Sequence, residues 1–130
     1  MQKINSPFEH LLQMFLVEQK EAYAKIGVIF REELTNPYGF FHGGFLATLA
    51  DTTAATALVG LSLPGPFLTG ELKIRYKSPS SAPEIYAESH AHQIKLNYWE
   101  NKVRIIDKNN TLIALASVKS FLPNWKQNKP

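Results

Sequence analysis

Residues 43–61 form the most constraining stretch of this sequence, because they are typical of a helix with no charged face. Between Glu33 and Glu71 the only residue with a formal charge is Asp51. Apolar residues recur at helical spacing, and the other side of the predicted helix carries Thr and Ala instead of Lys, Arg or Glu. A helix of this kind must be enclosed nearly all round by the rest of the protein.

The remaining segments predict strands with one further helix. Residues 22–34, 68–78, 84–96, 99–107 and 112–121 have β-strand character, and Thr69 falls on the polar face of its strand with Glu71 and Lys73. Ser6-Pro7 predicts an N-terminal helix over about 7 to 19. Because hairpin-linked strands pair antiparallel, we expect an α+β fold in which a curved antiparallel sheet wraps around the long helix.

The length of the chain predicts one domain, residues 1–130, with a core over about 20–122 and a tail at 123–130. The absence of cysteine excludes disulfides, thiolate metal sites and a cysteine nucleophile. The first residues do not resemble a secretory signal, so we expect a cytoplasmic protein. An acid and four threonines within residues 43–61 argue against a membrane span.

Charge is sparse and unevenly distributed along the chain. Charged residues make up 19% of the sequence, and a surface poor in charge predicts a homo-oligomer. Residues 1–71 hold 4 Lys and Arg against 7 Asp and Glu, whereas residues 72–130 hold 10 against 4. The second half therefore either meets an anionic partner or is a solvated basic face. We expect no nucleic acid, because no known binding motif is present.

A small set of residues with defined spacing carries a family resemblance. Asn36 stands six residues before His42-Gly43-Gly44, Asp51 nine residues after His42, and Thr69 eighteen after Asp51. This pattern resembles the acyl-CoA thioesterases of the phenylacetic acid degradation branch of the hotdog superfamily. The resemblance spans about residues 20–122, and it implies a hotdog fold and hydrolysis of an acyl-CoA to free acid and CoA.

The chemistry of thioester hydrolysis agrees with two of these positions. Gly43 stands where the helix begins, so its N–H is a candidate donor to the developing oxyanion; otherwise the glycine pair only eases a tight turn. Asp51 follows by a little over two helical turns and can face the same side of the helix. The resemblance implies that Asp51 acts as nucleophile, through an anhydride, or as a base that activates water. The alternative is a buried acid that bonds backbone groups or Thr48.

The other predicted site residues have equally ordinary alternatives. Asn36 orients the thioester or water through its amide, or it forms an Asn-Pro turn. Thr69 positions the carboxylate from the neighbouring subunit, or it is an ordinary strand hydroxyl. We place His42, Gly44, Phe41 and Phe45 among the substrate-binding residues, although the aromatic residues fit a packed core as well. In the family, this histidine anchors the loop and is not the catalytic base.

The resemblance also implies partners. Two chains join their sheets edge to edge as a dimer, dimers pair into tetramers, and each site combines Asp51 of one chain with Gly43 of the other. We expect no cofactor and no metal, since His90 and His92 lack a third ligand with suitable spacing. Five basic residues are candidates for the CoA phosphates: Lys73, Arg75, Lys77, Lys102 and Arg104. A hotdog acyl-thioester hydratase or dehydratase and a non-catalytic acyl-CoA-binding module remain alternatives.

Overall fold

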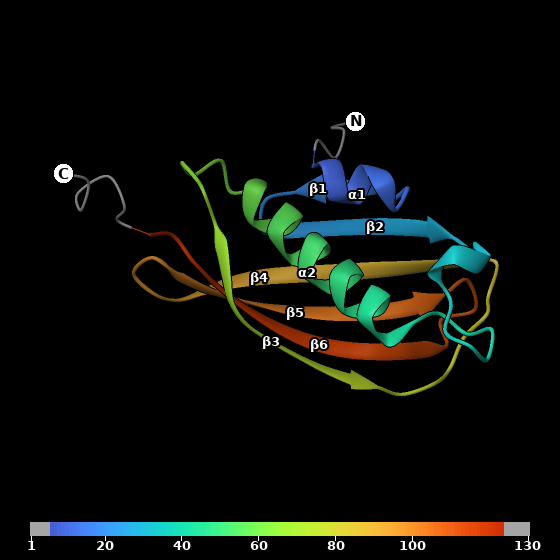
Figure 1. Cartoon of the computed structure of the whole chain (residues 1–130). Coiled ribbons are helices and arrows are strands. Elements are labelled where there is room, and N and C mark those ends of the chain that lie inside the picture. Colours follow the sequence, from blue (N-terminus) through green and yellow to red (C-terminus); the bar gives the residue numbers. More distant parts are fainter. Residues whose placement is uncertain (1–5, 124–130) are drawn as a thin grey trace.

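The computed structural model describes residues 6–123, which form a six-stranded antiparallel sheet curved around one long helix (Figure 1). The strands lie in the order β1-β2-β4-β5-β6-β3. The elements in chain order are α1 (Pro7–Leu11), β1 (Phe15–Lys20), β2 (Tyr23–Ile29), the 3-10 helix η1 (Glu32–Leu34), α2 (Gly43–Val59), β3 (Leu68–Tyr76), β4 (Glu84–Lys95), β5 (Tyr98–Asp107) and β6 (Leu112–Phe121). This confirms the predicted α+β hotdog architecture.

Helix α2 supplies the centre of the core, as its composition predicts. Leu49, Ala50 and Ala54 have no exposed surface and belong to the same buried cluster as apolar residues from every strand except β3. On the opposite side of α2, Ala47 and Asp51 are only half-buried, so one stripe of the helix stays partly open. Within residues 6–123, no helix is both long and apolar enough to cross a bilayer.

The predicted N-terminal helix over 7 to 19 is wrong in extent. Helix α1 ends at Leu11, and Gln13 takes a left-handed φ of 57° that turns the chain. Residues 15–20 then form β1, which pairs with β2 and buries Leu16. The apolar spacing fits a helix locally, but pairing with the edge of β2 satisfies the backbone of these residues and decides the outcome. Apart from Pro123, the predicted tail at 123–130 lies outside the described residues.

The predicted orientation of Thr69 is also wrong. Thr69 pairs with Ser120 and Glu71 pairs with Lys119, so β3 contains one residue more than β6 at this point, Gly70. Such a β-bulge interrupts the alternation of side chains. Thr69 therefore faces the helix, whereas Glu71 stays on the outer face of the sheet.

Candidate active site

The loop before α2 is anchored by His42, which caps the helix. The Gly44 N–H donates to His42 Nδ1 over 2.8 Å, and the His42 N–H donates to the Leu34 carbonyl over 2.8 Å. An accepting Nδ1 carries no proton, so the imidazole acts as a cap and not as a base in this arrangement. The Gly43 N–H, at the first position of α2, has no carbonyl within the helix to bond. Among residues 6–123 it has no hydrogen-bond partner, so it is an available donor at the positive end of the helix dipole.

Tyr76, on β3, holds the first peptide of the helix. Its hydroxyl donates to the Gly43 carbonyl over 2.7 Å. A Cβ atom on Gly43 would lie 3.2 Å from the Tyr76 hydroxyl, so glycine is what allows this close approach. The peptide between Gly43 and Gly44 is thus bonded at its carbonyl by Tyr76 and at its N–H by His42. Tyr76 is not among the site residues predicted from the sequence, and no local signal marks this contact.

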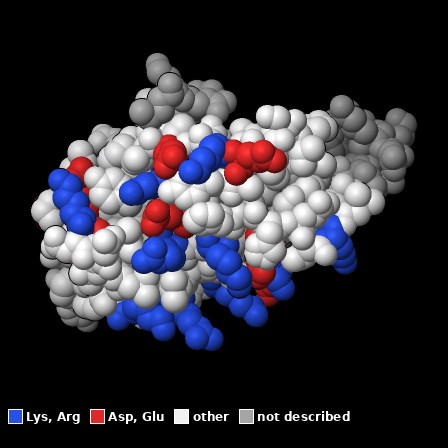
Figure 2. All heavy atoms as spheres, turned by 180° about the vertical axis from the view of Figure 1, so that it is seen from behind, with Lys and Arg blue, Asp and Glu red and all other residues white. Residues whose placement is uncertain are grey.

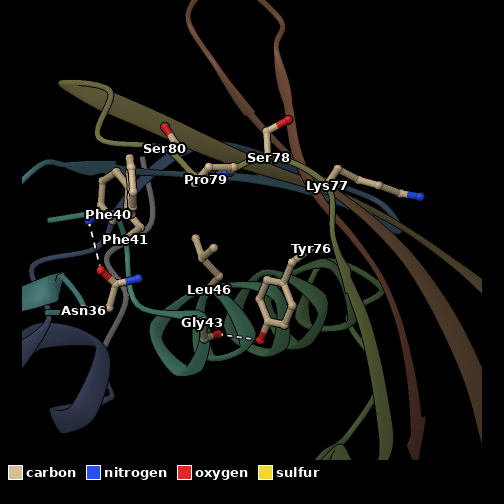
Figure 3. A pocket seen from close by; sticks show the side chains of 10 residues that line it. All are labelled: Asn36, Phe40, Phe41, Gly43, Leu46, Tyr76, Lys77, Ser78, Pro79 and Ser80. Atoms are coloured by element: carbon tan, nitrogen blue, oxygen red, sulfur yellow. Dashed lines mark hydrogen bonds between the residues drawn. The ribbon is translucent and has the colours of Figure 1, made fainter. Parts of the chain in front are cut away.

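Asn36 forms a turn, as one of its two sequence-based interpretations expects. Its Oδ1 accepts hydrogen bonds from the Tyr38 N–H over 2.9 Å and the Phe40 N–H over 3.2 Å, which is a turn-forming pattern. The same two bonds fix the amide, and Figure 3 shows its nitrogen pointing toward Leu46 and the interior of a cavity. The side chain is therefore both a loop former and an oriented donor.

This first cavity, of about 310 Å³, lies between the start of α2 and the end of β3. Its walls are mostly apolar, with aromatic rings on both sides (Figure 3). The residues that line it are Asn36, Phe40, Phe41, Gly43, Leu46, Tyr76, Lys77, Ser78, Pro79 and Ser80. A cavity of this size accommodates a small organic group, and Asn36 and Gly43 are among the residues that would contact it.

Asp51 lies further along α2 and is bonded by Thr69. The Thr69 hydroxyl donates to Asp51 Oδ1 over 2.6 Å, a short bond of the kind that charged acceptors form. The expectation that Thr69 approaches the carboxylate from a neighbouring subunit is wrong for this contact, because both residues belong to one chain. The bulge at Gly70 explains how a strand residue of an apparently polar face reaches the helix.

The predicted substrate-binding residues are divided between two cavities. A second cavity, of about 280 Å³, lies on another side of the start of α2, between α1, η1 and α2. His42, Gly44 and Phe45 line it, whereas Phe41 lines the first cavity. Phe41 and Phe45 stack on each other with centroids 6.1 Å apart and are also part of the core. Asp51 lines neither of these two cavities.

Most of the predicted phosphate-binding residues face away from this region. Strand pairing puts Lys73, Arg75, Lys102 and Arg104 on the face of the sheet opposite α2. Figure 2, seen from behind, shows basic side chains interleaved with acidic ones there. Three of the four pair with a glutamate: Lys73 with Glu71, Lys102 with Glu100 and Arg104 with Glu88. Of the five candidates, only Lys77 lines the first cavity.

The family of this chain follows from comparison with known sequences. A family model described as "Thioesterase superfamily" matches residues 38–114, which include the start of α2, Asp51 and Thr69. The chain belongs to the thioesterase superfamily. Membership in this superfamily identifies the protein as a thioester hydrolase of the hotdog fold, in agreement with the resemblance seen in its sequence.

Relatives of this thioesterase agree with the assignment. An Archaeoglobus fulgidus protein named "Putative esterase" is 32% identical over 113 residues, which cover 86% of this chain and 72% of that protein. The structure of the E. coli PaaI protein from the phenylacetic acid degradation operon superposes with a TM-score of 0.85, at 21% identity, over 92% of this chain and 86% of that one. The TT0310 protein of Thermus thermophilus gives 0.82, at 23% identity, over 92% and 100%. At these identities the structures support the fold alone.

Proposed function

We propose that this thioesterase hydrolyses an acyl-CoA to a free acid and CoA, with the Gly43 N–H as oxyanion donor and Asp51 as the reacting carboxylate. The observation that supports the proposal is the first cavity, which is lined both by Gly43 at the start of α2 and by Asn36, whose amide is held by two loop bonds. Both are neutral donors that need no rearrangement when negative charge develops on a carbonyl oxygen. Donors of this kind supply a large part of catalysis in acyl transfer.

Asp51 has two chemically balanced routes. As nucleophile, its carboxylate oxygen bonds the acyl carbon and the carbon–sulfur bond breaks, so CoA leaves as a thiolate and an anhydride remains, which water hydrolyses. As base, it takes a proton from water, the resulting hydroxide bonds the acyl carbon, and the departing thiolate receives a proton. The hydrogen bond from Thr69 holds one carboxylate oxygen in place and leaves the other for either step.

The proposed site is completed by a second copy of the chain. Gly43 and Asp51 are eight residues apart on one helix, or about 12 Å along its axis, so one carbonyl group does not contact both. Strand β3 is the last strand of the sheet, and an unpaired edge is a template for another strand. If two β3 strands pair antiparallel about Lys73, Tyr76 of one lies opposite Gly70 of the other. This brings each Thr69–Asp51 pair beside the other copy's Gly43.

We propose that the CoA part of the bound substrate extends out of the first cavity past Lys77. The Lys77 side chain extends away from the cavity wall in Figure 3, and an ammonium group in this position supports a contact with a CoA phosphate. Ser78 and Ser80 line the same rim and offer hydroxyl groups to the polar arm of the substrate. The ion-paired residues on the far face of the sheet have no part in this proposal.

Hydrolysis of an acyl-CoA panel by wild type and Asp51→Asn tests the proposal. The panel spans aliphatic chain lengths and arylacetyl groups, and free CoA is detected with a thiol reagent. We expect turnover by the wild type and a loss of at least about a thousandfold in Asp51→Asn, because the amide is neither nucleophile nor base. Affinity for a non-hydrolysable thioether analogue should persist in the variant. Equal turnover by both proteins would reject the role of Asp51, and binding without turnover by the wild type would favour a non-catalytic module.

A further inference from the structure

Two hydroxyl groups of β3 bond the two proposed reacting positions of α2. The Tyr76 hydroxyl donates to the Gly43 carbonyl over 2.7 Å, and the Thr69 hydroxyl donates to Asp51 over 2.6 Å. The helix positions are eight residues apart and the strand positions seven apart. The edge strand is thereby tied to the helix at two separate points, one for each half of the proposed site.

The alternation of a regular strand would not permit both contacts. Residues separated by an odd number of positions point to opposite faces of a sheet, so Thr69 and Tyr76 would face opposite sides. The additional residue at Gly70 removes this conflict, because Thr69 pairs with the buried Ser120 while Glu71 pairs with the exposed Lys119. The bulge is thus the feature that turns Thr69 inward without moving Tyr76.

The number of residues in the bulge matters more than the identity of Gly70. A Cβ atom added to Gly70 would have its nearest neighbour, a carbon of the Phe121 ring, 3.5 Å away, which is an ordinary contact. Gly70 is also not among the glycines with a positive φ. Within one chain a side chain therefore has room at this position, whereas loss of the residue would shift the register.

The hydrogen bond from Tyr76 restrains a flexible part of the backbone, the pair Gly43-Gly44. Two consecutive glycines at the start of a helix have more backbone freedom than any other pair, and each disfavours the helix relative to alanine. The bonds from Tyr76 and His42 restrain the same peptide from its two ends. The direction of the neighbouring Gly43 N–H depends on that peptide staying fixed.

We infer that Tyr76 and the Gly70 bulge are positioning elements of the active site: Tyr76 fixes the oxyanion donor, and the bulge places Thr69 on Asp51. The inference rests on the proposed function and extends it to residues that do not touch the reacting atoms. Neither element needs to bind substrate to act. Their loss should reduce the rate of the chemical step and leave substrate affinity nearly unchanged.

Five variants test this inference through kcat and KM separately. Tyr76→Phe retains the ring that lines the cavity and removes only the hydroxyl, so kcat should fall about tenfold with KM within about twofold. Tyr98→Phe is the matched control at an exposed tyrosine of the sheet, with no expected change. Deletion of Gly70 should lower kcat at least as far as Thr69→Val does, whereas Gly70→Ala should retain most of the rate because the bulge persists.

Wild-type kcat in Tyr76→Phe would overturn the role of Tyr76, and wild-type kcat in the deletion would overturn that of the bulge. If the deletion variant does not fold by circular dichroism, Thr69→Val with Thr69→Ser as rescue replaces it. Amide hydrogen exchange at Gly44 supplies a readout that needs no turnover: Tyr76→Phe should accelerate it about tenfold. If the wild type hydrolyses no thioester, the proposed function fails, but faster exchange still supports the tyrosine contact and unchanged exchange refutes it.

Discussion

Asn36→Asp separates the turn-forming role of Asn36 from its proposed role as oxyanion donor, because aspartate keeps the shape of the side chain and replaces only its N–H₂ group. In the wild type, Oδ1 accepts hydrogen bonds from the Tyr38 and Phe40 N–H groups while the amide nitrogen faces the first cavity. A carboxylate accepts the same two bonds and holds the loop equally well. In place of the N–H₂ donor, however, it presents a negatively charged oxygen to the oxyanion.

The expected loss of kcat follows from the two loop bonds that Asn36→Asp keeps and the N–H₂ donor that it removes. Removal of one oxyanion donor typically lowers kcat by about 10²–10³, or about 2.7–4 kcal/mol in activation free energy. The nearby negative charge opposes the oxyanion further, so we expect a loss of at least about 10³ in Asn36→Asp. The free energy of unfolding should stay within about 0.5 kcal/mol of the wild type, because the two loop bonds persist.

The assay pairs acyl-CoA hydrolysis with chemical denaturation of wild type, Asn36→Asp and Asn36→Ala. The alanine variant loses the loop bonds as well as the donor, so it should be both inactive and less stable, by about 1–2 kcal/mol. Asn36→Asp should be inactive but stable. An active, stable Asn36→Asp would show that Asn36 only shapes the turn, and the proposed donor role would have to be abandoned.

Three further predictions concern other parts of the structure. His42→Ala removes the helix cap and should lower the free energy of unfolding by about 1 kcal/mol. His42→Asn keeps a capping oxygen and should retain activity within a few-fold. A much larger loss of kcat in His42→Asn would indicate that His42 acts as a base. Gly60→Ala should lower the free energy of unfolding by about 1–3 kcal/mol, because its Cβ would overlap the Lys20 carbonyl, while Gly70→Ala should be neutral in the same denaturation experiment. Burial, together with the Glu88 carboxylate, raises the pKa of Tyr23 from 10.0 to about 12. Between these two pKa values the folded state keeps a proton that the unfolded chain releases. The stability from this group is therefore present below pH 10 and is lost toward pH 12. In denaturation experiments at several pH values, the free energy of unfolding of Tyr23→Phe should lack this decrease.

The pattern of the sequence was sufficient to predict the architecture. A helix with one acid and no basic residue over residues 43–61 needs a sheet around it, and four strands in succession after it can only pair antiparallel. The spacing of Asn36, Gly43 and Asp51 also indicated the loop and helix on which the proposed site lies. These inferences depend on local periodicity and short-range spacing, which the sequence displays directly.

The predictions that proved wrong concern positions where contact with a segment distant in the sequence determines the local structure. Residues 15–20 have helical spacing, yet they form β1 because the edge of β2 is available for pairing. Thr69 alternates with the polar residues of its strand, yet a bulge against β6 turns it toward Asp51. The contact of Tyr76 with Gly43 joins residues 33 positions apart and leaves no trace in either local sequence. Only the assembled fold reveals these three features.

Mixing two inactive variants tests most directly whether Asp51 of one chain acts on a carbonyl group held by another. Asn36→Asp and Asp51→Asn chains are unfolded together, refolded and assayed, with each variant refolded alone as the control. Random pairing makes about half of the dimers mixed, and each mixed dimer contains one intact site, so the mixture should recover about one quarter of wild-type activity. A mixture as inactive as its components would contradict a site shared between two chains.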